Sequence, residues 1–181
     1  MLAVGLAVAG CGGGRSQDAG EPAGMFRVDV VKASFPAKQH VARSESLVIA
    51  VKNTGDRAVP DVAVTVDSFS ARSDQTGLAD ANQAVWVVDS EPRGGTTAYA
   101  NTWALGPLPP GRTRRFVWHV TAVRPGTHTV RWRVAAGLNG KAKAMLAGNR
   151  APAGRFTVDI SDEPAQARVD PDSGKVVRSG G

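Results

Sequence analysis

The stretch Arg115–Ala135 reads RFVWHVTAVRPGTHTVRWRVA, and its alternation of apolar and polar residues predicts two β-strands. Arg124-Pro125-Gly126 separates the two runs and is typical of a tight turn. We therefore predict a hairpin with one buried face. The large side chains that share this face are Phe116, Trp118, Val120, Val130, Trp132 and Val134.

The three residues of the turn also predict which side chains lie opposite each other. The expected cross-strand pairs are Val120 with Val130, Trp118 with Trp132, and Phe116 with Val134. A slip of one residue would bury Arg131 and Arg133, so the alternation specifies the register strongly.

Outward from this hairpin, further segments show the same alternation. One such segment is Leu47–Lys52, which is followed by a turn at Asn53–Asp56. The valines of 62–66 come next, and we expect them to form a strand that pairs with Leu47–Lys52 through that turn. The remaining segments are Phe26 with Val28 and Val30 or Val31, a weaker one at Val85–Val88, and Phe156 with Val158 and Ile160. We predict an all-β protein, an immunoglobulin-like antiparallel sandwich of about six to eight strands.

The N-terminus has the features of an export signal. Residues 2–10 are small and apolar, too few to span a membrane but enough for the apolar region of a signal peptide. Val8-Ala9-Gly10-Cys11 resembles the bacterial lipobox, which implies that Cys11 carries a diacylglyceryl lipid and becomes the first residue of the mature protein. No Lys or Arg precedes the apolar run, so we expect translation to start upstream of Met1. The alternative is a short buried segment with a free cysteine.

These features divide the chain into four parts. We predict a signal peptide at 1–10, a lipidated, Gly-rich tether at 11–24, the sandwich at 25–161 and a polar tail at 162–181. The tail is expected to be loose or to form a weak hairpin through Val169 and Val176–Val177. Asp170–Gly174 is expected to be a polar turn, because the later acidic ligand of a calcium loop is missing.

Charge and composition fit this location. The chain is 42% hydrophobic and 21% charged, which is typical of a globular domain, and its formal charge is +6. An exported basic protein meets anionic lipids and wall polymers, so we expect no nucleic acid partner. We expect an extracytoplasmic protein anchored to the cell membrane by its lipid.

The stretch LVIAVKNTGDRAVPDVAVTV, residues 47–66, resembles the opening of bacterial immunoglobulin-like domains of the CARDB and DUF11 type. In these domains an N-x-G turn follows an alternating strand. Leu105–Leu108 with Pro110-Gly111 also fits their habit of a Pro-Gly turn before the next strand. The resemblance covers about a third of the domain, and it implies an adhesive, spacer or surface-display module that is not an enzyme.

No catalytic motif is present in the sequence. It contains no G-x-S-x-G, P-loop or H-E-x-x-H pattern, and His40, His119 and His128 lack the spacing of a metal site. We predict no catalytic residues, no metal and no cofactor. A hydrolase built from scattered Ser, His and Asp side chains is the weaker alternative.

Two groups of residues are candidates for binding a ligand or partner. Region 68–101 has weak periodicity, and Trp86, Arg93, Tyr99 and Trp103 in or beside it would bind carbohydrate, peptide or anionic wall polymer if they converged on one concave surface. The alternative for these aromatic residues is packing in the core or at a sheet edge.

A basic stripe is the second candidate. If the predicted hairpin forms, Arg131 and Arg133 lie on its outer face with Arg112, Arg114 and Arg115. Such a stripe would hold wall polymer or lipid headgroups, or would only be a solvated face that discourages aggregation. We expect a membrane-anchored, non-catalytic interaction, adhesion or spacer module whose partner is an envelope protein or an anionic wall polymer.

Overall fold

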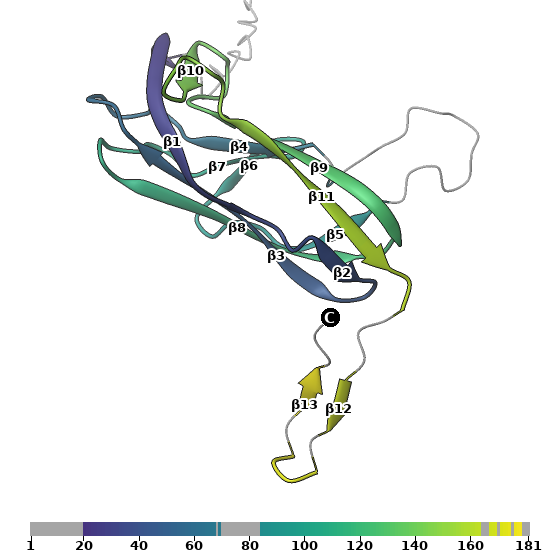
Figure 1. The fold of residues 1–181 in the computed structure, drawn as a ribbon. Coiled ribbons are helices and arrows are strands. Elements are labelled where there is room, and N and C mark those ends of the chain that lie inside the picture. Colours follow the sequence, from purple (N-terminus) through teal and green to yellow (C-terminus); the bar gives the residue numbers. More distant parts are fainter. Residues whose placement is uncertain are drawn as a thin grey trace, which may run out of the picture.

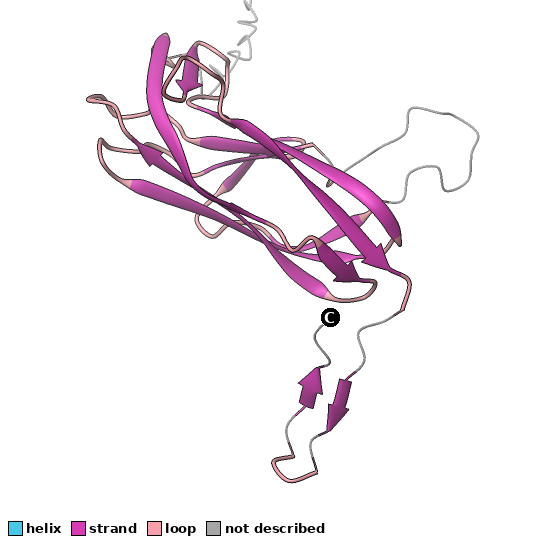
Figure 2. Ribbon diagram, in the orientation of Figure 1, coloured by secondary structure: helices cyan, strands magenta, loops and turns pink. Residues whose placement is uncertain are grey.

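The structure is a computed structural model that describes residues 20–67, 69, 84–163, 167–169, 171–174 and 176–178 of the 181-residue chain. Two β-sheets pack face to face (Figures 1 and 2). The five-stranded sheet is ordered β10 (Ala142–Met145), β1 (Gly24–Ser34), β3 (Ser44–Asn53), β8 (Thr113–Ala122) and β5 (Trp86–Ser90). The six-stranded sheet is ordered β2 (Lys38–His40), β11 (Ala153–Ser161), β9 (Gly126–Ala135), β4 (Ala63–Val66), β7 (Thr102–Ala104) and β6 (Thr96–Tyr99). None of the described residues forms a helix that could cross a membrane.

The strand order identifies the type of sandwich. The sequence β1-β3-β8-β5 in one sheet and β11-β9-β4 in the other corresponds to the A-B-E-D and G-F-C sheets of immunoglobulin domains. Most neighbouring strands are antiparallel, while β1 with β10 and β11 with β2 are parallel. The predicted immunoglobulin-like sandwich is therefore confirmed, with more strands in the two sheets than the six to eight expected. The additional ones are short strands of three or four residues: β2, β6, β7 and β10.

The predicted hairpin of residues 115–135 is wrong in its pairing and right in its buried face. β8 pairs with β3 and β5, whereas β9 pairs with β4 and β11 in the opposite sheet. The six apolar side chains predicted to share a face are all buried and meet across the core: Phe116, Trp118, Val120, Val130, Trp132 and Val134. Alternation reports which face is buried, and a strand that crosses to the other sheet keeps the same alternation.

The expected pairing of β3 with β4 is wrong for the same reason. The turn at Asn53–Asp56 ends β3 as predicted, but the chain then crosses to the six-stranded sheet, where β4 pairs with β7 and β9. In β1 the register shifts between Val30 and Lys32, so Val31 is half exposed while Val28 is buried. The alternation predicted for this strand holds up to that bulge.

The two ends of the described chain also bear on the predictions. β12 (Ala167–Val169) pairs with β13 (Val176–Arg178), so this part of the tail forms a hairpin, which was the second of the two forms expected for it. At the other end β1 begins at Gly24, and Glu21 already contacts the domain, since its carboxylate accepts hydrogen bonds from the backbone N–H groups of Leu138, Asn139 and Ala142. Residues 1–19, with Cys11, lie outside the described residues.

Candidate functional site

A cleft of about 350 Å³ opens on the outer face of the five-stranded sheet, between β8 and the segment that follows β5. Its lining combines two arginines, a glutamate and a histidine with a serine and a valine. These residues are Ser90, Glu91, Arg93, Arg115, Val117 and His119.

Strand alternation places half of this lining. Phe116, Trp118 and Val120 of β8 point into the core, so Arg115, Val117 and His119 point outward from the same strand. The other half comes from the end of β5, where the pairing with β8 shifts between Val88 and Ser90 and brings Ser90 opposite His119. Bulges of this kind change the direction of side chains at sheet edges. Here the chain leaves the edge strand β5 at Ser90 and continues into Glu91 and Arg93.

Two hydrogen bonds hold polar side chains of the cleft in place. Ser46 is on the neighbouring strand β3, and its hydroxyl lies 3.0 Å from Nδ1 of His119. This contact leaves Nε2 as the remaining polar atom of the His119 ring. The Thr97 hydroxyl donates to Oε2 of Glu91 at 3.0 Å. Both groups are therefore oriented by partners outside the cleft lining.

The two guanidinium groups of the cleft have no such partner. Within the described ranges, neither the Arg93 nor the Arg115 side chain forms a hydrogen bond or an ion pair. Both side chains belong to exposed residues. The cleft therefore contains two guanidinium groups against the single carboxylate of Glu91.

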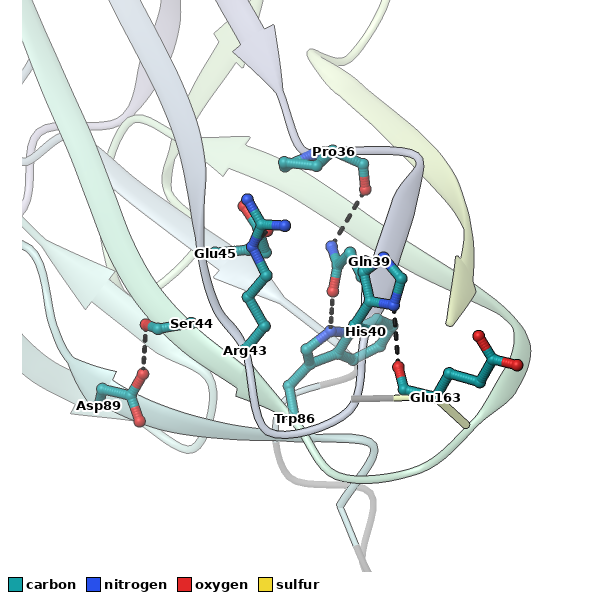
Figure 3. A network of polar contacts seen from close by, with 9 residues as sticks. All are labelled: Pro36, Gln39, His40, Arg43, Ser44, Glu45, Trp86, Asp89 and Glu163. Carbon is teal, nitrogen blue, oxygen red and sulfur yellow. Dashed lines mark hydrogen bonds and ion pairs between the residues drawn. The ribbon is translucent and has the colours of Figure 1, made fainter. Parts of the chain in front are cut away.

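A serine and a histidine in contact, such as Ser46 and His119, are two of the three residues of a Ser-His-Asp triad. The third residue, a carboxylate bonded to the histidine, is missing among the described residues. The carboxylate of Asp89 accepts hydrogen bonds from Ser44 (2.7 Å, Figure 3) and Thr121 (2.8 Å). Among the described residues no carboxylate is hydrogen-bonded to His119, and its Nδ1, the atom that a triad carboxylate would hold, faces Ser46. The contact between Ser46 and His119 therefore does not have the arrangement of a Ser-His-Asp triad.

The structure does not bring Trp86, Arg93, Tyr99 and Trp103 together. Trp86 is 1% exposed, and its indole N–H donates to Oε1 of Gln39 at 2.8 Å (Figure 3). Trp103 is also buried, in the opposite sheet, whereas Tyr99 is 54% exposed on β6. Both tryptophans are core residues, the alternative considered for them, and of the four only Arg93 lines the cleft.

The predicted basic stripe is not formed, because β8 and β9 lie in opposite sheets. Arg131 and Arg133 are exposed on the outer face of the six-stranded sheet, away from Arg115. Arg133 donates to both carboxylate oxygens of Asp67, at 2.8 and 3.1 Å. Arg131 stands directly opposite Arg155 of β11. Arg115 is thus separated from Arg131 and Arg133, which lie on the outer face of the other sheet.

The histidines are separated in the same way. The His40 ring donates through Nδ1 to the carbonyl of Glu163, and the His128 ring donates through Nε2 to the carbonyl of Pro125. Only His119 lines the cleft. In the part of the chain that the structure describes, no three His, Cys, Asp or Glu side chains are grouped as metal ligands.

Sequence reasoning did not assemble this cleft, although it named Arg93 and Arg115 separately as binding candidates. The alternation of β8 had already implied that Arg115, Val117 and His119 share one outer face. The partners from β5 had no comparable signal, since a bulge beside a short edge strand leaves no period to read.

No protein-family model and no curated protein matches the chain. Among solved structures it is similar to a CARDB domain from Pyrococcus furiosus, crystallised in complex with di-metal ions, at 14% identity over 77% of this chain and 93% of that one, with a TM-score of 0.45. It is also similar to native α2-macroglobulin from Escherichia coli, at 13% identity over 83% of this chain and 21% of that one, with a TM-score of 0.48. A third similar structure is β-glucosidase from Listeria innocua, at 13% identity over 76% of this chain and 16% of that one, with a TM-score of 0.39. Likenesses of this size say nothing about activity or ligand, and the fold assignment rests on the strand order itself.

Proposed function

We propose that the chain is a non-catalytic binding module that a lipid on Cys11 anchors to the outside of a bacterial cell membrane. The observation that carries the binding role is the cleft on the five-stranded sheet, where Arg93 and Arg115 lack partners among the described residues. Guanidinium groups without an ion-pair partner, one on β8 and one in the turn after β5, are able to pair with an anionic ligand. The Ser46–His119 contact without a carboxylate favours binding over nucleophilic catalysis.

The lipobox resemblance at Val8–Cys11 supports the anchor. In this proposal the signal peptide 1–10 is removed, two or more acyl chains on Cys11 hold the protein stably, and residues 11–24 form the tether. Glu21 binds the loop between β9 and β10, so the tether reaches the domain at that loop. The partner is an envelope protein or an anionic wall polymer, and adhesion or spacing follows from holding it near the membrane.

Metabolic labelling with a palmitate analogue in a bacterial host tests the anchor. The full chain and its Cys11→Ala variant are compared in membrane and soluble fractions. Ser16→Ala, within the same proposed tether, is the matched control. We expect label and membrane association for the unmodified chain and the control, and loss of both in the Cys11→Ala variant.

An unlabelled chain in the cytoplasmic fraction would contradict the anchor and the envelope location. The positive charge of the protein would then make nucleic acid the first partner to test. Label that persists in Cys11→Ala would contradict the assignment of the lipid to this cysteine.

A further inference from the structure

We propose that the cleft on the five-stranded sheet binds an oxyanion, carboxylate or phosphate, carried by one hydroxylated unit of an acidic envelope polymer. The inference rests on the proposed binding role and gives it a ligand chemistry. It is carried by the way the six lining residues divide their roles: Ser90, Glu91, Arg93, Arg115, Val117 and His119.

The positive charge of the cleft selects an anion. Arg93 and Arg115 come from two different segments and line the same concave site, and neither has an ion-pair partner in the described ranges. A planar guanidinium presents parallel N–H donors that match the two oxygens of a carboxylate or phosphate. An oxyanion between the two arginines would therefore satisfy guanidinium donors that have no partner among the described residues.

The remaining polar groups select what carries the anion. The carboxylate of Glu91 is held by Thr97 and accepts hydrogen bonds, so it suits a ligand hydroxyl and repels a second anionic group. His119, oriented by Ser46, keeps Nε2 for a further hydrogen bond, and Ser90 offers a hydroxyl. The combination fits a scaffold that bears one anion beside hydroxyl groups, such as a uronic acid or a glycerol phosphate unit.

The size of the cleft agrees with a single unit. A volume of about 350 Å³ lies at the small end of ligand sites. Val117 is the single apolar residue of the lining. Its cross-strand partner Val48, on the neighbouring strand β3, is 6% exposed. The cleft opens on a sheet face, so a polymer is able to continue beyond the bound unit.

Binding to the full chain carrying Cys11→Ala tests the proposal without the lipid. Glucuronate and glycerol 3-phosphate are titrated separately while amide chemical shifts are followed by NMR. We expect shifts confined to residues 90–93 and 115–119 and to the facing part of β3. We also expect at least one probe to bind, with an affinity that falls about tenfold in each of Arg93→Ala and Arg115→Ala, the equivalent of about 1.4 kcal/mol.

Arg131→Ala is the matched control, because it removes the same charge from the opposite sheet. Binding of glucuronate alone assigns a carboxylate-bearing source, and binding of glycerol phosphate alone a phosphate-bearing one. Binding of neither probe overturns the proposal, as does an equal loss in Arg131→Ala, which would indicate attraction by net charge only. Thermal unfolding of each variant establishes that it is folded. Because palmitate labelling does not depend on the cleft, failure of the two proposals is distinguishable.

Discussion

Asn53 is a fully buried polar residue at the end of β3, and its side-chain amide bonds to three backbone groups, two in the turn that follows it and one at Leu108. Its Nδ2 donates to the carbonyls of Arg57 and Leu108, each at 2.8 Å, and its Oδ1 accepts from the N–H of Gly55 at 2.9 Å. The Asn-x-Gly turn seen in the sequence is thus held from inside the domain. A buried side chain with three such bonds fixes where β3 ends and where the crossing to β4 begins.

We expect Asn53→Ala to destabilise the domain by about 2 to 3 kcal/mol, because two carbonyls and one N–H lose their partner in a buried site. Chemical unfolding followed by tryptophan fluorescence measures the change. Thr54→Ala, at an exposed position in the same turn, is the control and is expected to change the free energy of unfolding by less than about 0.5 kcal/mol. Equal stabilities of the two variants would contradict this role.

Glu21 is the second residue whose contacts make a specific prediction. Partial burial acts to raise the pKa of its carboxyl, and the backbone N–H groups of the 138–142 loop lower it by more, so the pKa lies below its ordinary value. A carboxyl whose pKa is lower in the folded state stabilises the fold above its unfolded pKa. This stability is lost as the pH falls through that value toward the folded pKa.

Glu21→Gln is therefore expected to unfold more easily than the unmodified chain at pH 7, by about 1 kcal/mol, and to approach its stability near pH 3. Urea unfolding between pH 7 and pH 3 measures both. Gly137→Ala should behave in the same way, because a Cβ at this position would collide with the Glu21 carboxylate and displace it. A stability difference that stays constant over this pH range would show that the carboxylate contributes nothing through its charge.

At the scale of elements, two short edge strands from opposite sheets are joined by one buried hydrogen bond. Trp86 of β5 donates to Gln39 of β2, and Gln39 donates onward to the carbonyl of Pro36 at 3.0 Å (Figure 3). The ring of Phe35 packs on Trp86, with centroids 5.6 Å apart. Because β2 has only three residues in its ladder with β11, we expect this contact to help fix its position.

A double-mutant cycle on Gln39→Leu and Trp86→Phe measures this contact. Each single variant leaves one buried polar group without its partner, so we expect each to cost about 1 to 3 kcal/mol, and the double variant to cost less than the sum by about 1 kcal/mol. Lys38→Ala, exposed on the same strand, is the control. Additive costs would mean that the two side chains act independently and that packing alone holds β2.

The elements also show what the sequence could and could not predict. Long alternating strands such as β8 and β9 were identified, and their buried faces were assigned correctly, because period-two burial is a local property. The short strands β2, β6, β7 and β10 were missed, because their three or four residues show no alternation of large apolar side chains. β4 is equally short and was identified from the valines at 62, 64 and 66. The half of the cleft formed by Ser90, Glu91 and Arg93 could not be placed for a related reason, since its position depends on the five-residue strand β5 and on the bulge near its end.

At the scale of the whole molecule, alternation leaves the partner of a strand undetermined. In a sandwich of immunoglobulin type, consecutive strands often lie in opposite sheets, and the chain crosses between them at 53–63 and at 122–126. A turn that contains Pro and Gly serves a hairpin and a crossing equally well. The basic stripe was predicted from an assumed hairpin, so it failed together with that pairing, while the individual arginines are exposed as expected.

Engineered disulfides separate the two topologies directly. His119 lies opposite Ser46 of β3 in the sandwich, whereas the hairpin register would have set it opposite Arg131. In a Cys11→Ala background, Ser46→Cys with His119→Cys is expected to form a disulfide under mild oxidation, because facing positions on paired strands meet the distance that the bond requires. His119→Cys with Arg131→Cys is expected to stay reduced in the folded protein, because its two positions are on opposite outer faces and the core lies between them. Counting free thiols by mass spectrometry distinguishes the two double-cysteine variants. A disulfide between positions 119 and 131, with none between positions 46 and 119, would support the hairpin and contradict the crossing at 122–126.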